Sequence, residues 1–375
     1  MIAMSSRRIA YFVPTLLHLM NCIITQETIF KKESADIIFQ DVFTFNEIRD
    51  RVREAGIFEN VYTFNTVQER AKYRAMSGNE RHKVERDPAL LFTFPSFVQE
   101  YTDLCVNIDA WASKSFYYGL VNQGMLPKIH FVSEGTGTYA LDFENTRNDK
   151  MDHEYYGAKS FLNNIGNTYL YKPELYTGGS KLIHPVALPY YDELDESVRK
   201  KLDFIFGQAQ PFKQKVIFFE GAFWGDGMLT NEIRLFMDIA HHVGKENIIV
   251  KRHPRNYVDR FSPLGFSVMP EQSIPWEIMI KDIDLSKKLL ISVASFTCYS
   301  AQEMYQRTSQ AILLHKLLKG KVYFLENPGY KRFFFNAGKV FNANEIVSRE
   351  PKTQYELHIA LDAISNKIGG FKHDD

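Results

Sequence analysis

Residues Asn247–Lys251 read NIIVK, and the polar run Arg252–Arg255 (RHPR) follows them directly. The five residues NIIVK form a short apolar segment that is typical of a buried strand. Before it, Asn231–Val243 has helical spacing, and Lys215–Phe219 (KVIFF) is again strand-like. A strand, a helix and a strand in this order indicate a βαβ unit, so the sequence predicts an α/β fold with a parallel sheet.

The same alternation extends on both sides of this segment. Further strands are predicted at Ile9–Val13, Ala35–Phe39, Asn60–Phe64, Lys128–Val132 and Lys288–Val293, and helices from Thr15 and at Asn46–Ala55, Glu100–Tyr118 and Tyr355–Ile368. The polar segment Tyr190–Gln214 fits a linker. Because 375 residues is about twice the length of a typical domain, we expect two domains, residues 1–200 and 201–375.

Composition restricts the function classes. Lys plus Arg and Asp plus Glu both number 45, so the formal net charge is zero. Nucleic-acid binding requires a basic excess, and we therefore expect no nucleic-acid partner. The cysteines Cys22, Cys105 and Cys298 are far apart and form no C-x-x-C pair. This spacing argues against a disulfide framework or a zinc knuckle and favours a reducing compartment.

The beginning of the chain has some features of a secretory signal. Arg7 and Arg8 precede the apolar run Ile9–Ile24, as the basic and hydrophobic regions of a signal peptide do. The run is interrupted by Pro14, is too short to span a bilayer, and is followed by no small-residue cleavage site. We therefore expect a strand and a helix here, and a protein that stays in the cytoplasm.

The first motif that could carry chemistry is Ser133–Gly137 (SEGTG), directly after the predicted strand Lys128–Val132. A carboxylate at a strand end beside a glycine can be approached closely by a substrate. Glu134 is therefore a candidate general base toward a hydroxyl group. The alternative is a solvated glutamate in a tight turn. The glycines do not have the G-x-G-x-x-G spacing of a dinucleotide site.

The second motif is the run Arg252–Arg255. Its cations and His253 can stabilise a phosphate leaving group as negative charge develops on it, and Pro254 stiffens the chain beside them. The alternative is a basic surface turn. Ligands of open α/β sheets bind at the carboxyl ends of the strands, where both motifs lie.

The third motif is the strand-to-helix turn Ser292–Thr297. The hydroxyls of Ser295 and Thr297 can bind phosphate, although such residues also serve as helix caps. His241 and His242 are adjacent on a predicted helix and point to different faces, so we interpret both as structural. The sequence shows no set of residues with metal-ligand spacing.

An acid followed by glycine, then His-Pro, then a Ser/Thr turn, each after a strand, is an order that resembles bacterial sialyltransferases of the GT-B type. The similarity is to glycosyltransferase family 52, the lipooligosaccharide and capsule sialyltransferases, and it includes the early turn Thr15–Leu19. This resemblance implies two Rossmann-like domains, with parallel sheets facing a central cleft and a C-terminal helix.

The resemblance also implies an activity. It is a metal-independent, inverting transfer from CMP-sialic acid to a sugar hydroxyl, with galactose as the expected acceptor and with no cofactor. Glu134 would deprotonate the acceptor, and His253 would assist the departing CMP phosphate. The implied phosphate-binding residues are His253, Pro254, Arg255, Ser295 and Thr297, and the implied substrate-binding residues are Thr15, His18, Gly135, Thr136 and Gly137. Two positions depart from the family pattern, Ser133 in place of an acid and His18 in place of Gln.

The expected partners are the CMP-sugar donor and an oligosaccharide or lipid-linked glycan acceptor. Residues 305–340 contain seven Lys or Arg against the single acid Glu326, together with Phe333–Phe335. Such a segment can rest on an anionic inner membrane, or its phenylalanines can be core and its cations solvated. A homodimer is also left open. The alternatives in function are another CMP-sugar enzyme, such as a capsule Kdo transferase, and a catalytically silent nucleotide- or glycan-binding protein.

Overall fold

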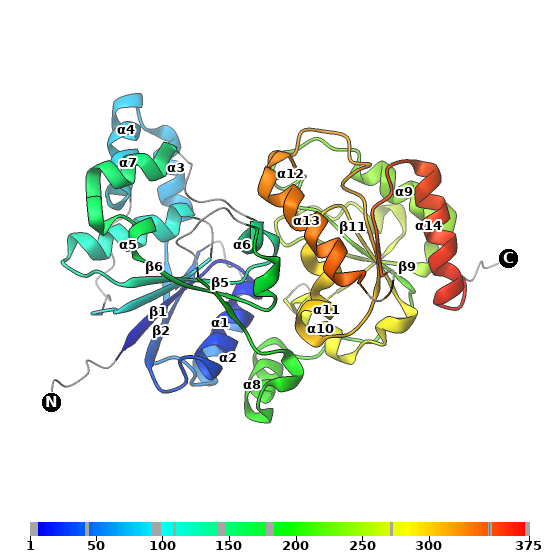
Figure 1. Cartoon of the computed structure of the whole chain (residues 1–375), viewed down its shortest axis with the longest axis horizontal. Coiled ribbons are helices and arrows are strands. Elements are labelled where there is room, and N and C mark those ends of the chain that lie inside the picture. Colours follow the sequence, from blue (N-terminus) through cyan, green and yellow to red (C-terminus); the bar gives the residue numbers. More distant parts are fainter. Residues whose placement is uncertain are drawn as a thin grey trace. The chain divides into compact units, whose positions relative to one another are not determined.

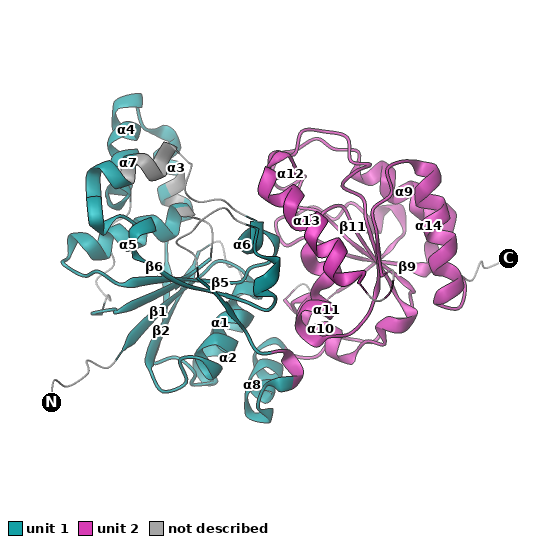
Figure 2. Ribbon diagram, in the orientation of Figure 1, with its two compact units in different colours: residues 1–189, 193–206 teal, residues 190–192, 207–375 magenta. Residues whose placement is uncertain are grey.

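The computed structural model describes residues 7–41, 45–91, 99–107, 110–140, 147–177, 184–270, 273–343, 345 and 347–371. The chain forms two compact units, drawn in different colours in Figure 2. Unit 1 comprises Met1–Pro189 and Glu193–Phe206, and unit 2 comprises Tyr190–Asp192 and Gly207–Asp375.

Unit 1 is built on a parallel seven-stranded sheet with the order β3-β2-β1-β4-β5-β6-β7 (Figure 1). Its strands are β1 (Arg8–Val13), β2 (Ser34–Gln40), β3 (Asn60–Phe64), β4 (Asp103–Val106), β5 (Lys128–Val132), β6 (Ile165–Leu170) and β7 (His184–Ala187). Its helices are α1 (Leu16–Thr28), α2 (Asn46–Glu54), α3 (Val67–Ala75), α4 (Gly78–Arg86), α5 (Ala110–Asn122), α6 (Thr136–Ala140), α7 (Arg147–Tyr156) and α8 (Glu196–Phe206).

The register of this sheet aligns the carboxyl ends of its central strands. Phe12 of β1 pairs with Val106 of β4, which pairs with Phe131 of β5. Neighbouring strands lie about 4.8 Å apart. The residues that follow β1, β4 and β5 therefore share one short edge.

Two sequence predictions for unit 1 were wrong in part. The helix predicted over Glu100–Tyr118 is instead the strand β4 followed by α5 from Ala110. All four residues of β4 are buried between β1 and β5, and a short apolar run does not distinguish a buried strand from a helix segment. The predicted linker Tyr190–Gln214 contains α8, an amphipathic helix that belongs to unit 1.

Unit 2 contains a parallel six-stranded sheet with the order β10-β9-β8-β11-β12-β13. Its strands are β8 (Val216–Phe219), β9 (Ile248–Lys251), β10 (Ser267–Val268), β11 (Leu289–Ser292), β12 (Gln310–Leu313) and β13 (Ser348–Arg349). Its helices are α9 (Glu232–Val243), α10 (Trp276–Met279), α11 (Ser300–Tyr305), α12 (Tyr323–Glu326), α13 (Pro328–Phe341) and α14 (Gln354–Lys367). The two parallel sheets confirm the predicted α/β class.

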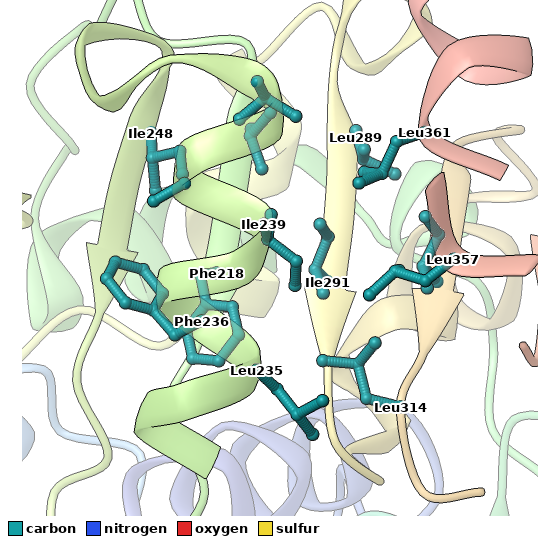
Figure 3. Close-up of a cluster of buried hydrophobic side chains, with 14 of the residues drawn as sticks. Phe218, Leu235, Phe236, Ile239, Ile248, Leu289, Ile291, Leu314, Leu357 and Leu361 are labelled. Atoms are coloured by element: carbon teal, nitrogen blue, oxygen red, sulfur yellow. The ribbon is translucent and has the colours of Figure 1, made fainter. Parts of the chain in front are cut away.

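The core of unit 2 lies between the sheet and the helices α9 and α14 (Figure 3). Phe236 and Ile239 of α9 and Leu361 of α14 are completely buried, as are Phe218 and Ile291 on the sheet. Burying one such side chain contributes about 1.5–3 kcal/mol. This packing fixes β8 and β11, so the turns that follow them have a rigid base.

Two further findings concern the whole described chain. Cys22, Cys105 and Cys298 are buried and free. No helix within the described ranges is both long and apolar enough to cross a bilayer.

Candidate active site

The carboxyl end of β5 presents Glu134. The preceding Ser133 is buried, its N–H donates to the carbonyl of Tyr169 over 3.0 Å, and its carbonyl accepts from Asn21 Nδ2 over 2.7 Å. These bonds fix the end of the strand, and Glu134 leaves the sheet half-buried. Gly135 has a φ of +99°, which residues with a Cβ rarely adopt, so the turn into α6 requires a glycine.

The Glu134 carboxylate has a buried partner that the sequence did not reveal. Asn107, directly after β4, donates from Nδ2 to Glu134 Oε2 over 2.7 Å. The backbone N–H of Glu134 donates to Thr138 Oγ1 over 3.0 Å. Thr136 and Gly137 lie half-buried beside this bond, in the first turn of α6. Asn107 was missed because residues 100–118 were predicted to be helical.

Thr15 and His18 lie at the start of α1. Thr15 is the N-cap, and its hydroxyl accepts from the N–H of His18 over 3.2 Å. An added Cβ at Gly135 would lie 4.0 Å from Leu17 Cδ2, so the start of α1 lies beside the Glu134 turn. The His18 ring is completely buried, and its Nε2 lies 3.6 Å from the Sγ of Cys22. In this position the His18 ring packs within the core and does not reach solvent.

Burial lowers the pKa of His18 to about 3, which makes stability depend on pH. Below pH 6.5 the unfolded chain takes up a proton at His18 that the folded chain does not, so the free energy of unfolding falls as the pH falls toward 3. We expect the loss between pH 7 and pH 5, measured by urea unfolding, to be smaller by about 2 kcal/mol in the His18→Gln variant. His82→Gln is the matched control, because the His82 side chain is exposed. Equal losses in His18→Gln and the native protein would contradict this account.

In unit 2, His253 follows β9 and is held by its backbone. Its N–H donates to Glu220 Oε2 over 3.1 Å, and its carbonyl accepts from the N–H of Asn256 over 2.9 Å. The N–H of Arg255 donates to His253 Nδ1 over 3.1 Å, which assigns the ring proton to Nε2. Burial, and then the Arg255 cation, lower the pKa of His253 to about 3. At neutral pH the ring is therefore a neutral donor through Nε2.

Pro254 and Arg255 are the exposed part of the same turn. The Arg255 guanidinium lies 2.9 Å from Asp226 Oδ1, and its side chain is 60% exposed. A surface pair of this kind is weak, so Arg255 can exchange Asp226 for a phosphate at small cost.

A buried charged cluster lies beneath this turn, and the sequence did not reveal it. Arg260 donates from Nε to Glu220 Oε1 over 3.0 Å and from Nη2 to Glu232 Oε2 over 2.9 Å. Glu232 also accepts from the N–H of Gly221 over 2.6 Å, and burial raises the pKa of Glu232 to about 7. Because Glu220 holds the N–H of His253, the cluster links the turns after β8 and β9.

This cluster should dominate the stability of unit 2. In the Arg260→Met variant Glu220 and Glu232 are left buried without a cation, and we expect the free energy of unfolding to fall by about 3–5 kcal/mol. Lys367→Met is the control, because its surface pair with Glu345 should contribute about 1 kcal/mol or less. Thermal and urea unfolding measure both. Equal effects of the two substitutions would show that the cluster is not a stabilising centre.

Ser295 and Thr297 form the turn after β11, at the start of a 3₁₀ helix, Phe296–Tyr299. The Ser295 hydroxyl donates to Thr297 Oγ1 over 2.6 Å and accepts from the N–H of Thr297 over 3.2 Å. Both residues are half-buried. Since β8 lies between β9 and β11, the His253 and Ser295 turns share one edge of the sheet, about 10 Å apart at their strand ends.

The next strand on this edge, β12, leads to His315 and Lys316, which belong to none of the three sequence motifs. Lys316 Nζ lies 2.6 Å from Glu350 Oε2, and His315 Nε2 lies 3.6 Å from the same oxygen. The His315 ring stacks on Phe334 with centroids 5.1 Å apart. These residues lie at the same edge of the sheet, beyond β11 on the side away from His253.

No group of three or more His, Cys, Asp or Glu side chains is placed to hold a metal ion in the described part of the chain. His242, which we interpreted as structural, contacts Asp362 Oδ1 through Nε2 over 2.8 Å and stacks on His358. It joins α9 to α14.

Solved structures are similar to this chain in fold. An alpha/beta-galactoside alpha-2,3-sialyltransferase from the luminous marine bacterium Photobacterium phosphoreum is similar, with a TM-score of 0.50 and 12% identity over 92% of this chain and 99% of that chain. A UDP-glucosyltransferase from Polygonum tinctorium has a TM-score of 0.48 and 11% identity over 95% and 89%. At such identity the first likeness shows the fold alone. The two Rossmann-like units have the GT-B architecture of glycosyltransferases.

The sequence places the protein within this class. The chain belongs to the family described as alpha-2,8-polysialyltransferase (POLYST), which matches residues 16–309. No curated protein sequence matches the chain. The family match confirms the resemblance to bacterial sialyltransferases that the three motifs indicated, and it makes the protein a glycosyltransferase by family.

Proposed function

We propose that the protein is an inverting, metal-independent sialyltransferase that moves sialic acid from CMP-N-acetylneuraminate to a hydroxyl, expected to be on galactose, of a bacterial surface glycan such as lipooligosaccharide or capsule. The observation that carries the proposal is the half-buried Glu134 carboxylate, which follows β5 and accepts a hydrogen bond from Asn107 in a chain of this family. Unit 1 is then the acceptor side, and unit 2 the donor side.

On the acceptor side, the oxygen of the acceptor hydroxyl attacks the anomeric carbon of the sialyl donor, and Glu134 takes up the proton of that hydroxyl. The bond from that carbon to the CMP phosphate oxygen breaks, and its electron pair stays on the phosphate. The carbon passes through an oxocarbenium-like state, as in glycosidic cleavage. One displacement inverts its configuration. Thr15 and the turn Gly135–Gly137 then border the acceptor.

On the donor side, the phosphate gains negative charge as the bond breaks. The Nε2–H of His253 donates to it, and Ser295, Thr297 and Arg255 add hydroxyl and guanidinium donors. As a neutral ring, His253 acts as a hydrogen-bond donor to the phosphate. A phosphate anion beside the ring raises the pKa of His253, and only a ring that has first taken up a second proton from solvent can pass the Nε2 proton to the departing CMP and return to the neutral form. We propose that these donors do the work that a metal ion does in other transferases.

The test is CMP release from CMP-N-acetylneuraminate and, in parallel, from CMP-Kdo, with lactose as acceptor and EDTA present. Release from the sialyl donor alone is the expected result. Release from CMP-Kdo alone would change the substrate class to a Kdo transferase. No release from either donor, together with calorimetric binding of CMP, would identify a silent nucleotide-binding protein.

Peripheral contact with the inner membrane from the cytoplasmic side stays a prediction, as does a homodimer. Of the three phenylalanines in the basic segment, Phe333 and Phe334 are buried in the core, whereas Phe335 is 61% exposed on α13. Lys339 Nζ lies 4.2 Å from the centroid of the Phe335 ring, and Lys331 and Arg332 are exposed on the same helix. This exposed face of α13 is where such a contact would form.

A further inference from the structure

The side chain of Asn107 is buried, but only one of its two polar atoms has a hydrogen-bond partner among the described residues. It is 2% exposed, its Nδ2 donates to Glu134 Oε2 over 2.7 Å, and its Oδ1 has no hydrogen bond partner among the described residues. A buried carbonyl oxygen without a donor costs folding about as much as a hydrogen bond contributes. The fold alone therefore gains little from this amide.

We infer that Asn107 is a positioning residue, which fixes the Glu134 carboxylate at the edge of the sheet and keeps it ionised for proton transfer. That Glu134 takes up a proton from the acceptor rests on the proposed function. That Asn107 holds the carboxylate rests on geometry alone. A donor to a carboxylate stabilises its charged form. Without it, Glu134 would be free to turn and would take up a proton at higher pH.

The position of Asn107 in the sheet suits this role. It directly follows β4, which lies between β1 and β5, and Val106 pairs with Phe131. The amide therefore comes from a rigid neighbouring strand. The Glu134 N–H is held separately, by Thr138 Oγ1 over 3.0 Å. A residue earlier in the chain, Asn107, therefore holds the carboxylate, and a residue later in the chain, Thr138, holds the backbone.

Titratable side chains from other elements also pack around this end of β5. His18 and Cys22 come from α1, Tyr139 from α6, and Tyr171 follows β6. Burial lowers the pKa of His18 to about 3 and raises the pKa of the Cys22 thiol well above its usual range. Burial likewise raises the pKa of the neighbouring Cys105 thiol on β4 well above its usual range, so between pH 4 and 8 none of these three groups changes its charge.

The experiment measures the titration of Glu134 directly. Carbon-13 NMR of protein labelled at the glutamate Cδ, with Glu134→Gln to assign the signal, gives its midpoint without any substrate. We expect the midpoint to rise by about one pH unit in Asn107→Ala. It should rise further in the isosteric Asn107→Asp, where two carboxyl groups face each other. The thermal midpoint of Asn107→Ala should stay close to that of the native protein.

Asn60→Ala is the matched control. Asn60 donates from Nδ2 to Asp36 Oδ1 over 2.8 Å, so it is also an amide bonded to a carboxylate, at the opposite end of the strands of the same sheet. It should not move the Glu134 midpoint. An unchanged midpoint in both Asn107 variants would overturn the inference.

Transfer assays separate this inference from the proposed function. In the native enzyme and the Asn107 variants, the acidic limb of kcat/KM for sialyl transfer should move with the NMR midpoint, with kcat lowered more than KM is raised. If the native protein transfers no sugar, the proposed function fails while the NMR titration still decides the role of Asn107. If transfer occurs and the acidic limb stays fixed in Asn107→Ala, the inference fails alone.

Discussion

Glu134→Gln is expected to lower the rate of sialyl transfer by about 10²–10⁴-fold, the usual contribution of a general base. Glutamine has the shape of glutamate, and its carbonyl can still accept the bond from Asn107 Nδ2, so the turn should keep its geometry. What the amide cannot do is take the proton of the acceptor hydroxyl. Initial rates with CMP-N-acetylneuraminate and lactose measure the loss.

The dissociation constant for CMP, measured by calorimetry, should change by less than about twofold in Glu134→Gln, since we assign CMP to unit 2 and Glu134 lies in unit 1. Glu27→Gln is the control, because Glu27 is also half-buried in unit 1 and pairs with Lys201 Nζ over 2.8 Å. It should retain activity. Transfer at the native rate in Glu134→Gln would mean that another group is the base.

The second large effect is expected at His253, where two amide substitutions distinguish the two ring nitrogens. A glutamine places its NH₂ group near the position of Nε2, and an asparagine places its NH₂ group near that of Nδ1. Because the Arg255 N–H already occupies Nδ1, the phosphate must use Nε2. His253→Asn should lose about 10²–10³-fold in kcat. If His253 acts mainly by a hydrogen bond from Nε2, His253→Gln should lose clearly less kcat than His253→Asn. If His253 acts mainly by donating a proton, the two variants should lose kcat equally. Native rates in both variants would remove His253 from the mechanism.

The pH dependence of CMP binding gives an independent measure of His253. In the empty protein its pKa is about 3, and a phosphate anion beside the ring must raise it. Binding then takes up a proton, so CMP affinity should increase as the pH falls from 7 to 5. The CMP phosphate itself titrates near pH 6, and His253→Gln supplies that background. A native profile identical to that of His253→Gln would show that the ring stays neutral in the complex.

The sequence predicted the strands and helices whose local hydrophobic pattern matches the way in which they are buried in the fold. The strands β1, β5, β8, β9 and β11 are short apolar runs beside helical segments, and the structure has each within a residue or two of the predicted bounds. β4 was missed because only three of its four residues are apolar and an aromatic helix begins shortly after it, at Ala110. Short edge strands such as β13 carry too few residues to show a pattern.

The same distinction applies to the candidate site. Glu134 and His253 were identifiable because each follows a strand, and the carboxyl edge of a parallel sheet collects such residues. Asn107 and Arg260 were not, because their roles depend on which strands are neighbours. Nothing local to Asn107 indicates that β4 lies beside β5, and nothing near Arg260 indicates two buried carboxylates 28 and 40 residues away.

The three buried thiols allow local opening to be measured separately in each unit. Cys22 and Cys105 lie in unit 1 and Cys298 in unit 2, and all three are 0% exposed. A thiol reagent can modify them only after the surrounding structure opens. Labelling rates under native conditions, resolved by peptide mass spectrometry, therefore report the opening equilibrium of each unit separately. Added CMP should slow labelling in the unit that binds it, so one native-state experiment assigns the nucleotide to its half of the chain.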